Sequence, residues 1–203
     1  PQQQPWLASS DNFPPTIDGH QILQDEDVEK QWLTNLIRWG LCRMTDMSLE
    51  EELLVKLMTN VGPIRGSNFG SLFHVKASPT PDSTANTGLN LGQHTDLPTR
   101  ESPPGYQFLH CIENTVSGGQ SRFTDGMAIT KALQAEQPEA FTLLTEEKWV
   151  FMNRTVEAEH RWEGPIIEMP DQGKPLTLRA FYPVRSAPRM AEEKIPAAYA
   201  ALR

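Results

Sequence analysis

The pattern of apolar residues changes at Gly62, and this change most constrains the fold. Before Gly62, apolar residues recur at helical spacing over 26–39 and 49–61. After it, apolar runs are mostly short and are separated by turn-forming residues, including many of the chain's 13 glycines and 17 prolines. Helices followed by short strands predict an α+β fold with a mainly β core, built as an antiparallel sandwich or barrel.

Helices are predicted where spacing and capping signals agree, and strands where a short apolar run lies between turns. The predicted helices cover 26–39 with a stop at Gly40, 48–60 with Ser48 opening a capping box, 127–134, 138–145 and 190–202. The core stripe expected on the second of these consists of Leu49, Leu53, Leu57 and Val61. The predicted strands cover 41–44, the segment around His94, 106–112, 121–124, 149–153, 166–169 and 177–182.

The length and the cysteines indicate one domain in a reducing compartment. A chain of 203 residues can bury a core, so we expect an extended N-terminal segment over 1–25 and a single domain over 26–203. Cys42 and Cys111 are too few for a disulfide framework and lie in apolar runs, which predicts buried reduced thiols. The expected location is the cytoplasm or an organelle matrix.

The charge and hydropathy argue against two classes of partner. A net charge of −8 without a basic cluster argues against nucleic acid and anionic membrane surfaces. The sequence contains no apolar run near the roughly 20 residues that a membrane span needs and no signal-peptide pattern. We therefore expect neither nucleic acid nor a membrane among the partners, and a homodimer is the candidate assembly.

His94 and Asp96 form the strongest chemical signal in the chain. Two residues apart on an extended segment, their side chains point to the same face, where an imidazole nitrogen and a carboxylate oxygen can bind one metal ion. One further ligand would complete the 2-His-1-carboxylate triad of non-haem Fe(II) oxygenases. The preceding residues 77–87 carry few large apolar side chains and predict a mobile loop that acts as a substrate lid.

Several separated motifs resemble those of the γ-butyrobetaine hydroxylase family, within the Fe(II)- and 2-oxoglutarate-dependent oxygenases that include taurine dioxygenase. The motifs are, in order, His94-Thr95-Asp96-Leu97-Pro98, Pro103-Pro104-Gly105-Tyr106-Gln107-Phe108-Leu109-His110-Cys111-Ile112, Gly118-Gly119-Gln120-Ser121 and Asp125-Gly126. The resemblance runs from about Glu26 to the C-terminus. It implies a double-stranded β-helix (jelly roll) with flanking helices, incomplete at the C-terminus of this chain.

The same resemblance implies the activity and the site. It makes His94 and Asp96 the first two Fe(II) ligands and catalytic residues, and Ser121 a hydrogen-bond partner of 2-oxoglutarate, with a plain strand serine as the alternative. The implied reaction hydroxylates an unactivated C–H bond of a small amino- or betaine-like acid, with O2 consumed and 2-oxoglutarate decarboxylated to succinate. Ascorbate is a candidate reductant.

Aromatic residues are the candidates for binding a quaternary ammonium, because cation–π attraction replaces the hydrogen bonds that such a group cannot make. Phe69 and Phe73 fall where the family places two such aromatics, and Tyr182 is a third candidate. Asn86 stands where a tyrosine would be expected, which leaves the butyrobetaine substrate open. Ordinary packing is the alternative for Phe69 and Phe73.

The third iron ligand and the 2-oxoglutarate-binding arginine have no counterpart at the expected positions. In the family they follow on a late strand, and we expect the domain in this chain to lack its last strands. No ligand role is assigned to His20, His74, His110 or His160: His110 is expected in the core or directly behind the metal ligands, and His160 in solvent. Arg179 and Arg185 are candidate carboxylate partners, with salt bridges as the safer interpretation.

Two further functions remain as alternatives. The first is a non-catalytic scaffold of the same fold that binds a small molecule without a complete triad. The second is a zinc hydrolase that uses His94 and Asp96, although no His-Glu-x-x-His or similar ligand set is present in the sequence.

Overall fold

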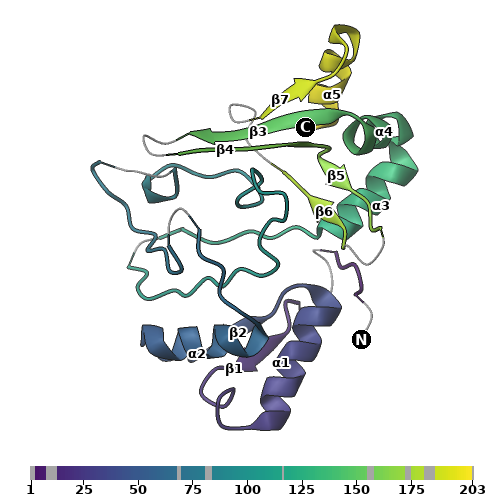
Figure 1. Cartoon of the computed structure of the whole chain (residues 1–203). Helices are drawn as coiled ribbons and strands as arrows, with labels where there is room; N and C mark the ends of the chain where they lie inside the picture. The colour runs from purple at the N-terminus through teal and green to yellow at the C-terminus, as the bar shows by residue number, and fades with distance from the viewer. Residues whose placement is uncertain are drawn as a thin grey trace. The chain divides into compact units, whose positions relative to one another are not determined.

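The structure is a computed structural model of the chain, and it forms two compact units (Figure 1). It describes residues 3–7, 13–67, 70–80, 84–115, 117–154, 158–171, 175–180 and 186–202. The first unit consists of Pro1–His74 and Tyr106–Ser121, and the second of Val75–Gly105 and Arg122–Arg203. Each unit has its own hydrophobic core.

The first helix of the first unit, α1 (Glu26–Trp39), has the bounds that the sequence predicts. The Asp25 carboxylate accepts hydrogen bonds from the Asp27 and Val28 amides at its N-terminus. Gly40 ends the helix with φ of 70°, a left-handed conformation that glycine adopts without steric cost.

The second helix, α2 (Glu51–Val61), begins later than predicted. Ser48 does not form a capping box, because its hydroxyl accepts a local hydrogen bond from the Glu50 amide at 3.3 Å and the helix starts after Glu50. Of the predicted core stripe, Leu57 is buried and Val61 packs against the core, whereas Leu49 is 59% exposed.

A short parallel sheet and an apolar cluster hold the first unit together. β1 (Thr16–Asp18) pairs with β2 (Arg43–Thr45), so part of the segment 1–25 that was predicted to be extended belongs to a sheet. The cluster centres on residues that are almost fully buried: Ile17, Ile22, Trp32 and Leu57. Phe108 packs against it, with its ring edge-on to Trp32 at 6.2 Å between centroids.

The second unit is built on an antiparallel sheet of order β4-β3-β7. Figure 1 shows β3 (Lys148–Arg154) and β4 (Glu159–Gly164) side by side, and β7 (Ser186–Arg189) pairs with the other edge of β3. A separate antiparallel pair joins β5 (Ile167–Glu168) to β6 (Thr177–Leu178).

Helices pack with the sheet of the second unit to form its core. They are α3 (Gly126–Glu136), α4 (Pro138–Glu146), the 3-10 turn η3 (Glu192–Lys194) and α5 (Ile195–Ala201). Trp149 and Phe151 on β3 are fully buried, and the Trp149 ring lies edge-on to Tyr199 of α5 at 5.6 Å. The C-terminal helix α5 is shorter than the predicted helix over 190–202. Pro196 lies in its first turn and does not interrupt it.

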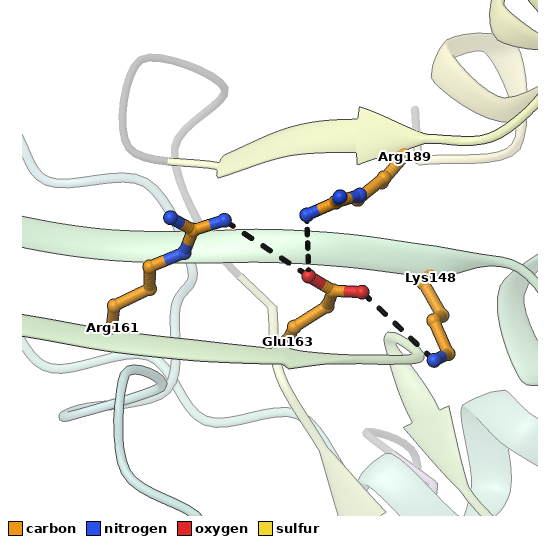
Figure 2. A network of polar contacts seen from close by, with 4 residues as sticks. All are labelled: Lys148, Arg161, Glu163 and Arg189. Atoms are coloured by element: carbon orange, nitrogen blue, oxygen red, sulfur yellow. Dashed lines mark hydrogen bonds and ion pairs between the residues drawn. The ribbon is translucent and has the colours of Figure 1, made fainter.

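A network of charges crosses the sheet at Glu163 of β4. Figure 2 shows the Glu163 carboxylate among three cations, with Arg189 at 2.9 Å, Lys148 at 3.9 Å and Arg161 at 4.0 Å. Lys148 and Arg189 face each other in the register of β3 and β7. Because these cations are more than half exposed, each pair contributes at most about 1 kcal/mol.

The strand predictions succeed in the second half of the chain and fail in the middle. Strands lie within 148–154, 167–168 and 177–178 as expected, but 106–112 and 121–124 have irregular backbone. β4 was not predicted, because Trp162 is the only large apolar residue among its charges. The helices and small sheets agree with an α+β class, and the structure contains no helix, among the residues it describes, able to span a membrane.

Candidate functional site

His94 and Asp96 lie in a segment without regular secondary structure, which corrects the predicted strand. Residues 91–105 contain bends and turns but neither helix nor strand. Leu97 has a positive φ of 51°, and the next two residues form a turn. A residue with this φ leaves the extended conformation, so the backbone turns away directly after Asp96.

The two side chains nevertheless converge as expected. Nε2 of His94 lies 3.3 Å from Oδ1 of Asp96, and the side chains are 32% and 48% exposed. Nδ1 of His94 lies 2.8 Å from the carbonyl oxygen of Gly92. Because a carbonyl oxygen only accepts, Nδ1 of His94 donates the hydrogen bond to Gly92, and Nε2 is the ring nitrogen that faces Asp96.

This arrangement fits a divalent metal ion. Metal–ligand bonds of about 2.1 Å at roughly a right angle place two ligand atoms about 3 Å apart, close to the observed separation. The Gly92 carbonyl would fix the histidine tautomer, as partners of metal-bound histidines commonly do. The partial exposure of both groups leaves them accessible to an ion from solvent.

A third protein ligand does not join the pair within the part of the chain that the structure describes. There, no group of three or more His, Cys, Asp or Glu side chains could hold a metal ion. The described residues therefore bring together two candidate ligands, a nitrogen donor and an oxygen donor of the kind that suits Fe(II).

Thr95 holds this segment in place. Its amide donates to the carbonyl oxygen of Ala180 at 2.9 Å, and its hydroxyl donates to the same oxygen at 3.2 Å. The preceding Gln93 side chain donates to the Thr124 hydroxyl. Nothing in the sequence indicates this role for Thr95, which lies between the two candidate ligands.

Four residues are predicted to bind 2-oxoglutarate and the ammonium group. Ser121 is exposed at the end of its segment, and Phe73 is 40% exposed; both belong to the first unit, whereas His94 belongs to the second. Phe69 and Tyr182 lie outside the described residues. The roles of these four residues stay predictions.

Asn86 closes the loop that was predicted to act as a lid. Its side-chain oxygen accepts from the Lys76 amide at 3.1 Å, and its carbonyl oxygen accepts from the Ser78 amide at 3.0 Å. Asn86 also ends the 3-10 turn η1 (Thr84–Asn86). The residue that replaces the expected tyrosine thus contacts the backbone of its own loop.

The other histidines differ in their surroundings. Both ring nitrogens of His110 are buried without a hydrogen-bond partner among the described residues, but the residue is only half-buried and does not lie on the predicted strand. His160 is half-buried on β4 opposite Asn153, which corrects the expectation that it lies in solvent. The strand around His160 was not predicted because its neighbours are charged. In this strand, alternate side chains point toward the covered face of the sheet.

Arg179 is fully buried and forms an ion pair with Glu168 on β5. This agrees with the interpretation that Arg179 forms a salt bridge within the protein, and not with a role in binding the carboxylate of the keto acid. The signal that could have revealed its burial is an arginine directly after Leu178 and before Ala180, in a run otherwise typical of a strand. Arg185 lies outside the described residues.

Comparison with known proteins identifies relatives along nearly the whole chain. Residues 3–203 match the family described as "Taurine catabolism dioxygenase TauD, TfdA family". A "Gamma-butyrobetaine dioxygenase" of Pseudomonas sp. (strain AK-1) is 38% identical over 189 residues, which cover 93% of this chain and 49% of that protein. A "Gamma-butyrobetaine dioxygenase" of Homo sapiens is 30% identical over 171 residues, or 81% of this chain and 43% of that protein.

A more distant relative carries a different substrate name. A "Trimethyllysine dioxygenase, mitochondrial" of Mus musculus is 27% identical over 132 residues, covering 65% of this chain and 31% of that protein. The chain thus spans about half the length, or less, of the curated relatives it matches. The resemblance to the γ-butyrobetaine hydroxylase family is confirmed, and the chain belongs to the taurine catabolism dioxygenase TauD, TfdA family, with γ-butyrobetaine dioxygenases among its relatives.

Proposed function

We propose that this chain is part of an Fe(II)- and 2-oxoglutarate-dependent oxygenase of the γ-butyrobetaine hydroxylase type, with a double-stranded β-helix fold. It hydroxylates an unactivated C–H bond of a small amino- or betaine-like acid and converts 2-oxoglutarate to succinate. The observation that carries the proposal is the approach of His94 Nε2 and Asp96 Oδ1 to 3.3 Å. Dioxygenase relatives over most of the chain support it.

In this proposal His94 and Asp96 hold the iron. The carboxylate of Asp96 offsets part of the ion's charge, and the contact between Nδ1 of His94 and the Gly92 carbonyl keeps Nε2 available as a ligand. Fe(II), when bound with 2-oxoglutarate and O2, supplies the oxidising chemistry that an unactivated C–H bond requires. The protein provides orientation and the exclusion of water.

Other residues are proposed to bind the organic molecules. Ser121 donates a hydrogen bond from its hydroxyl to 2-oxoglutarate. Phe69, Phe73 and Tyr182 contact the substrate, and an aromatic face would attract an ammonium group through its quadrupole. Asn86 shapes the substrate side through the loop that it closes.

The test is keto-acid turnover with γ-butyrobetaine and related trimethylammonium acids, measured as succinate formed. His94→Ala should abolish succinate formation, because it removes one of the two described ligands. His20→Ala is the matched control: His20 is exposed, belongs to the first unit and should leave turnover unchanged. Succinate formation by His94→Ala equal to that of the unmodified protein would contradict the proposal.

A binding module without catalysis is the second candidate. It is favoured by the lack of a third ligand within the described part of the chain. It predicts that the protein binds the keto acid or the trimethylammonium acid in calorimetry but forms no succinate with Fe(II). Fe(II)-dependent succinate formation that is lost in His94→Ala would eliminate this candidate.

A further inference from the structure

Arg179, in the second unit, is unusual because its charged side chain is entirely inaccessible to solvent. It is among the largest fully buried side chains of the described residues, with Trp149 and Phe151. Burying a guanidinium is unfavourable unless a charge and several hydrogen-bond acceptors surround it. The partners of Arg179 therefore indicate what its position achieves.

The partners connect β5 to the segment that carries the candidate ligands. Nη1 forms an ion pair with the Glu168 carboxylate. Nη2 donates to the carbonyl oxygens of Glu101 at 2.8 Å and Arg100 at 3.3 Å. The guanidinium carbon also lies 5.5 Å from the centre of the Trp162 ring, within the range of a cation–π contact.

The residue after Arg179 holds the same segment at a second point. The carbonyl oxygen of Ala180 accepts both hydrogen bonds of Thr95, the residue between His94 and Asp96. The Arg179 amide donates to the carbonyl oxygen of Ile166 at 2.8 Å, which fixes this stretch against β5. Two consecutive residues thus contact the ligand segment within the pair and shortly after it.

We propose that Arg179 is a positioning residue for His94 and Asp96, an inference that rests on the proposed metal site. The segment 91–105 contains no helix or strand, so no ladder of backbone hydrogen bonds sets the separation of the two ligands. The guanidinium and the Ala180 carbonyl supply that constraint from a part of the chain far away in sequence. Partners behind metal ligands commonly set ligand orientation in this way.

The geometry requires an arginine and not merely a cation. A guanidinium presents donors in a planar fork, so it reaches the Glu168 carboxylate and two carbonyl oxygens at the same time. A lysine has one nitrogen on a flexible stem and cannot span the same acceptors. Arg179→Lys should therefore keep the ion pair with Glu168 but lose the contacts with the carbonyls of Arg100 and Glu101.

The experiment compares Arg179→Met and Arg179→Lys with the control Arg189→Met. Arg189 is also paired with a glutamate in the second unit, Glu163 at 2.9 Å, but its side chain is 61% exposed and lies on the sheet (Figure 2). Two quantities are measured on folded protein: the hydrogen-exchange rates of the Thr95 and Phe151 amides, and the affinity for Co(II) as a stable substitute for Fe(II).

Loss of the contacts should loosen the ligand segment selectively. In Arg179→Met, exchange at Thr95 should rise about tenfold or more, whereas exchange at Phe151 in β3 changes far less. Co(II) binding should weaken by about 10-fold, because the segment would hold the two ligands less firmly at the separation that a metal ion needs. Arg179→Lys should show an intermediate loss, and Arg189→Met should match the unmodified protein.

Two results would overturn the proposal. One is Thr95 exchange and Co(II) affinity both unchanged in Arg179→Met, or in Arg179→Lys if the methionine variant does not fold. The other is an equal acceleration at Thr95 and Phe151 with unchanged Co(II) affinity, which would make Arg179 a purely structural residue. If the unmodified protein binds no Co(II), the proposed function fails instead, and Thr95 exchange still decides whether Arg179 orders the segment.

Discussion

At the scale of single residues, two histidine–carboxylate pairs allow a direct comparison. His74 Nε2 lies 3.3 Å from Glu51 Oε1, the same separation as between His94 and Asp96. The His74 side chain is 73% exposed, however, against 32% for His94. His94 is also held through Nδ1 by the Gly92 carbonyl. The separation of the histidine from the carboxylate is therefore the same in both pairs. The lower exposure of His94 and its contact with Gly92 distinguish the candidate site.

The two cysteines should differ sharply in reactivity. Burial raises the pKa of the Cys42 thiol to about 11, against a weaker opposing effect of a hydrogen bond with Asn35. Cys111 is exposed. Because the thiolate is the reactive form, iodoacetamide at pH 8 should modify Cys111 in the folded protein and spare Cys42 until urea unfolds it. Peptide mass spectrometry of the alkylated protein measures both.

The raised pKa of Cys42 also has a defined effect on stability. The folded state favours the neutral thiol, so the contribution is fully present below the ordinary value of 9.0 and is lost as pH rises toward about 11. A Cys42→Ala variant should show a weaker loss of stability over this range. Equal alkylation of Cys42 and Cys111 in the folded protein would contradict this account.

Single-residue burial was predicted only in part. Buried thiols were expected for both cysteines, but Cys42 is only half-buried, and Cys111 lies in a segment that is not a strand and is exposed. The sequence also did not reveal the fixed position of Thr95 or the carbonyl contacts of Arg179. These depend on Thr95 meeting Ala180 and on Arg179 meeting Glu101, residues far apart in the sequence, and no local pattern encodes such contacts.

At the scale of elements, helices were predicted better than strands. α1 and α4 follow closely from spacing and end signals, and α3 follows from Asp125, whose carboxylate accepts from the Met127 amide at 2.7 Å. Helix caps are formed by residues close together in the sequence, so they can be predicted from the sequence. Strands need partners, and the apolar runs at 106–112 and 121–124 have none in the described ladders.

The central strand β3 should carry much of the stability of the second unit. Phe151 is fully buried, whereas its neighbour Met152 is 44% exposed on the same strand. Phe151→Ala should lower the free energy of unfolding by about 3–5 kcal/mol, because it removes apolar contacts and leaves a cavity. Met152→Ala is the matched control and should cost about 1 kcal/mol or less.

Urea denaturation followed by circular dichroism measures both variants. Equal losses for Phe151→Ala and Met152→Ala would show that the alternation of buried and exposed residues along β3 does not describe the folded protein. A larger loss for Phe151→Ala is the expected outcome, with a slope similar to that of the unmodified protein.

At the scale of the whole molecule, the membership in the family is firm and the completed site is a proposal. The family match covers 3–203, and the chain spans about half the length of the curated relatives it matches. Sequence motifs predicted the pair of candidate ligands and the structure brings them together without the expected strand. Ser121 and Phe73 belong to the first unit, and their roles beside that pair stay predictions.

The central claim is that His94 and Asp96 bind one divalent metal ion, and calorimetric titration with Co(II) tests it most directly. The comparison uses the unmodified protein, Asp96→Asn and, as the matched control, His74→Ala from the exposed pair. The expected result is equal binding by the unmodified protein and His74→Ala, and binding weakened by about 10-fold or more in Asp96→Asn, which loses the charged ligand. Binding by Asp96→Asn as tight as that of the unmodified protein would contradict the account.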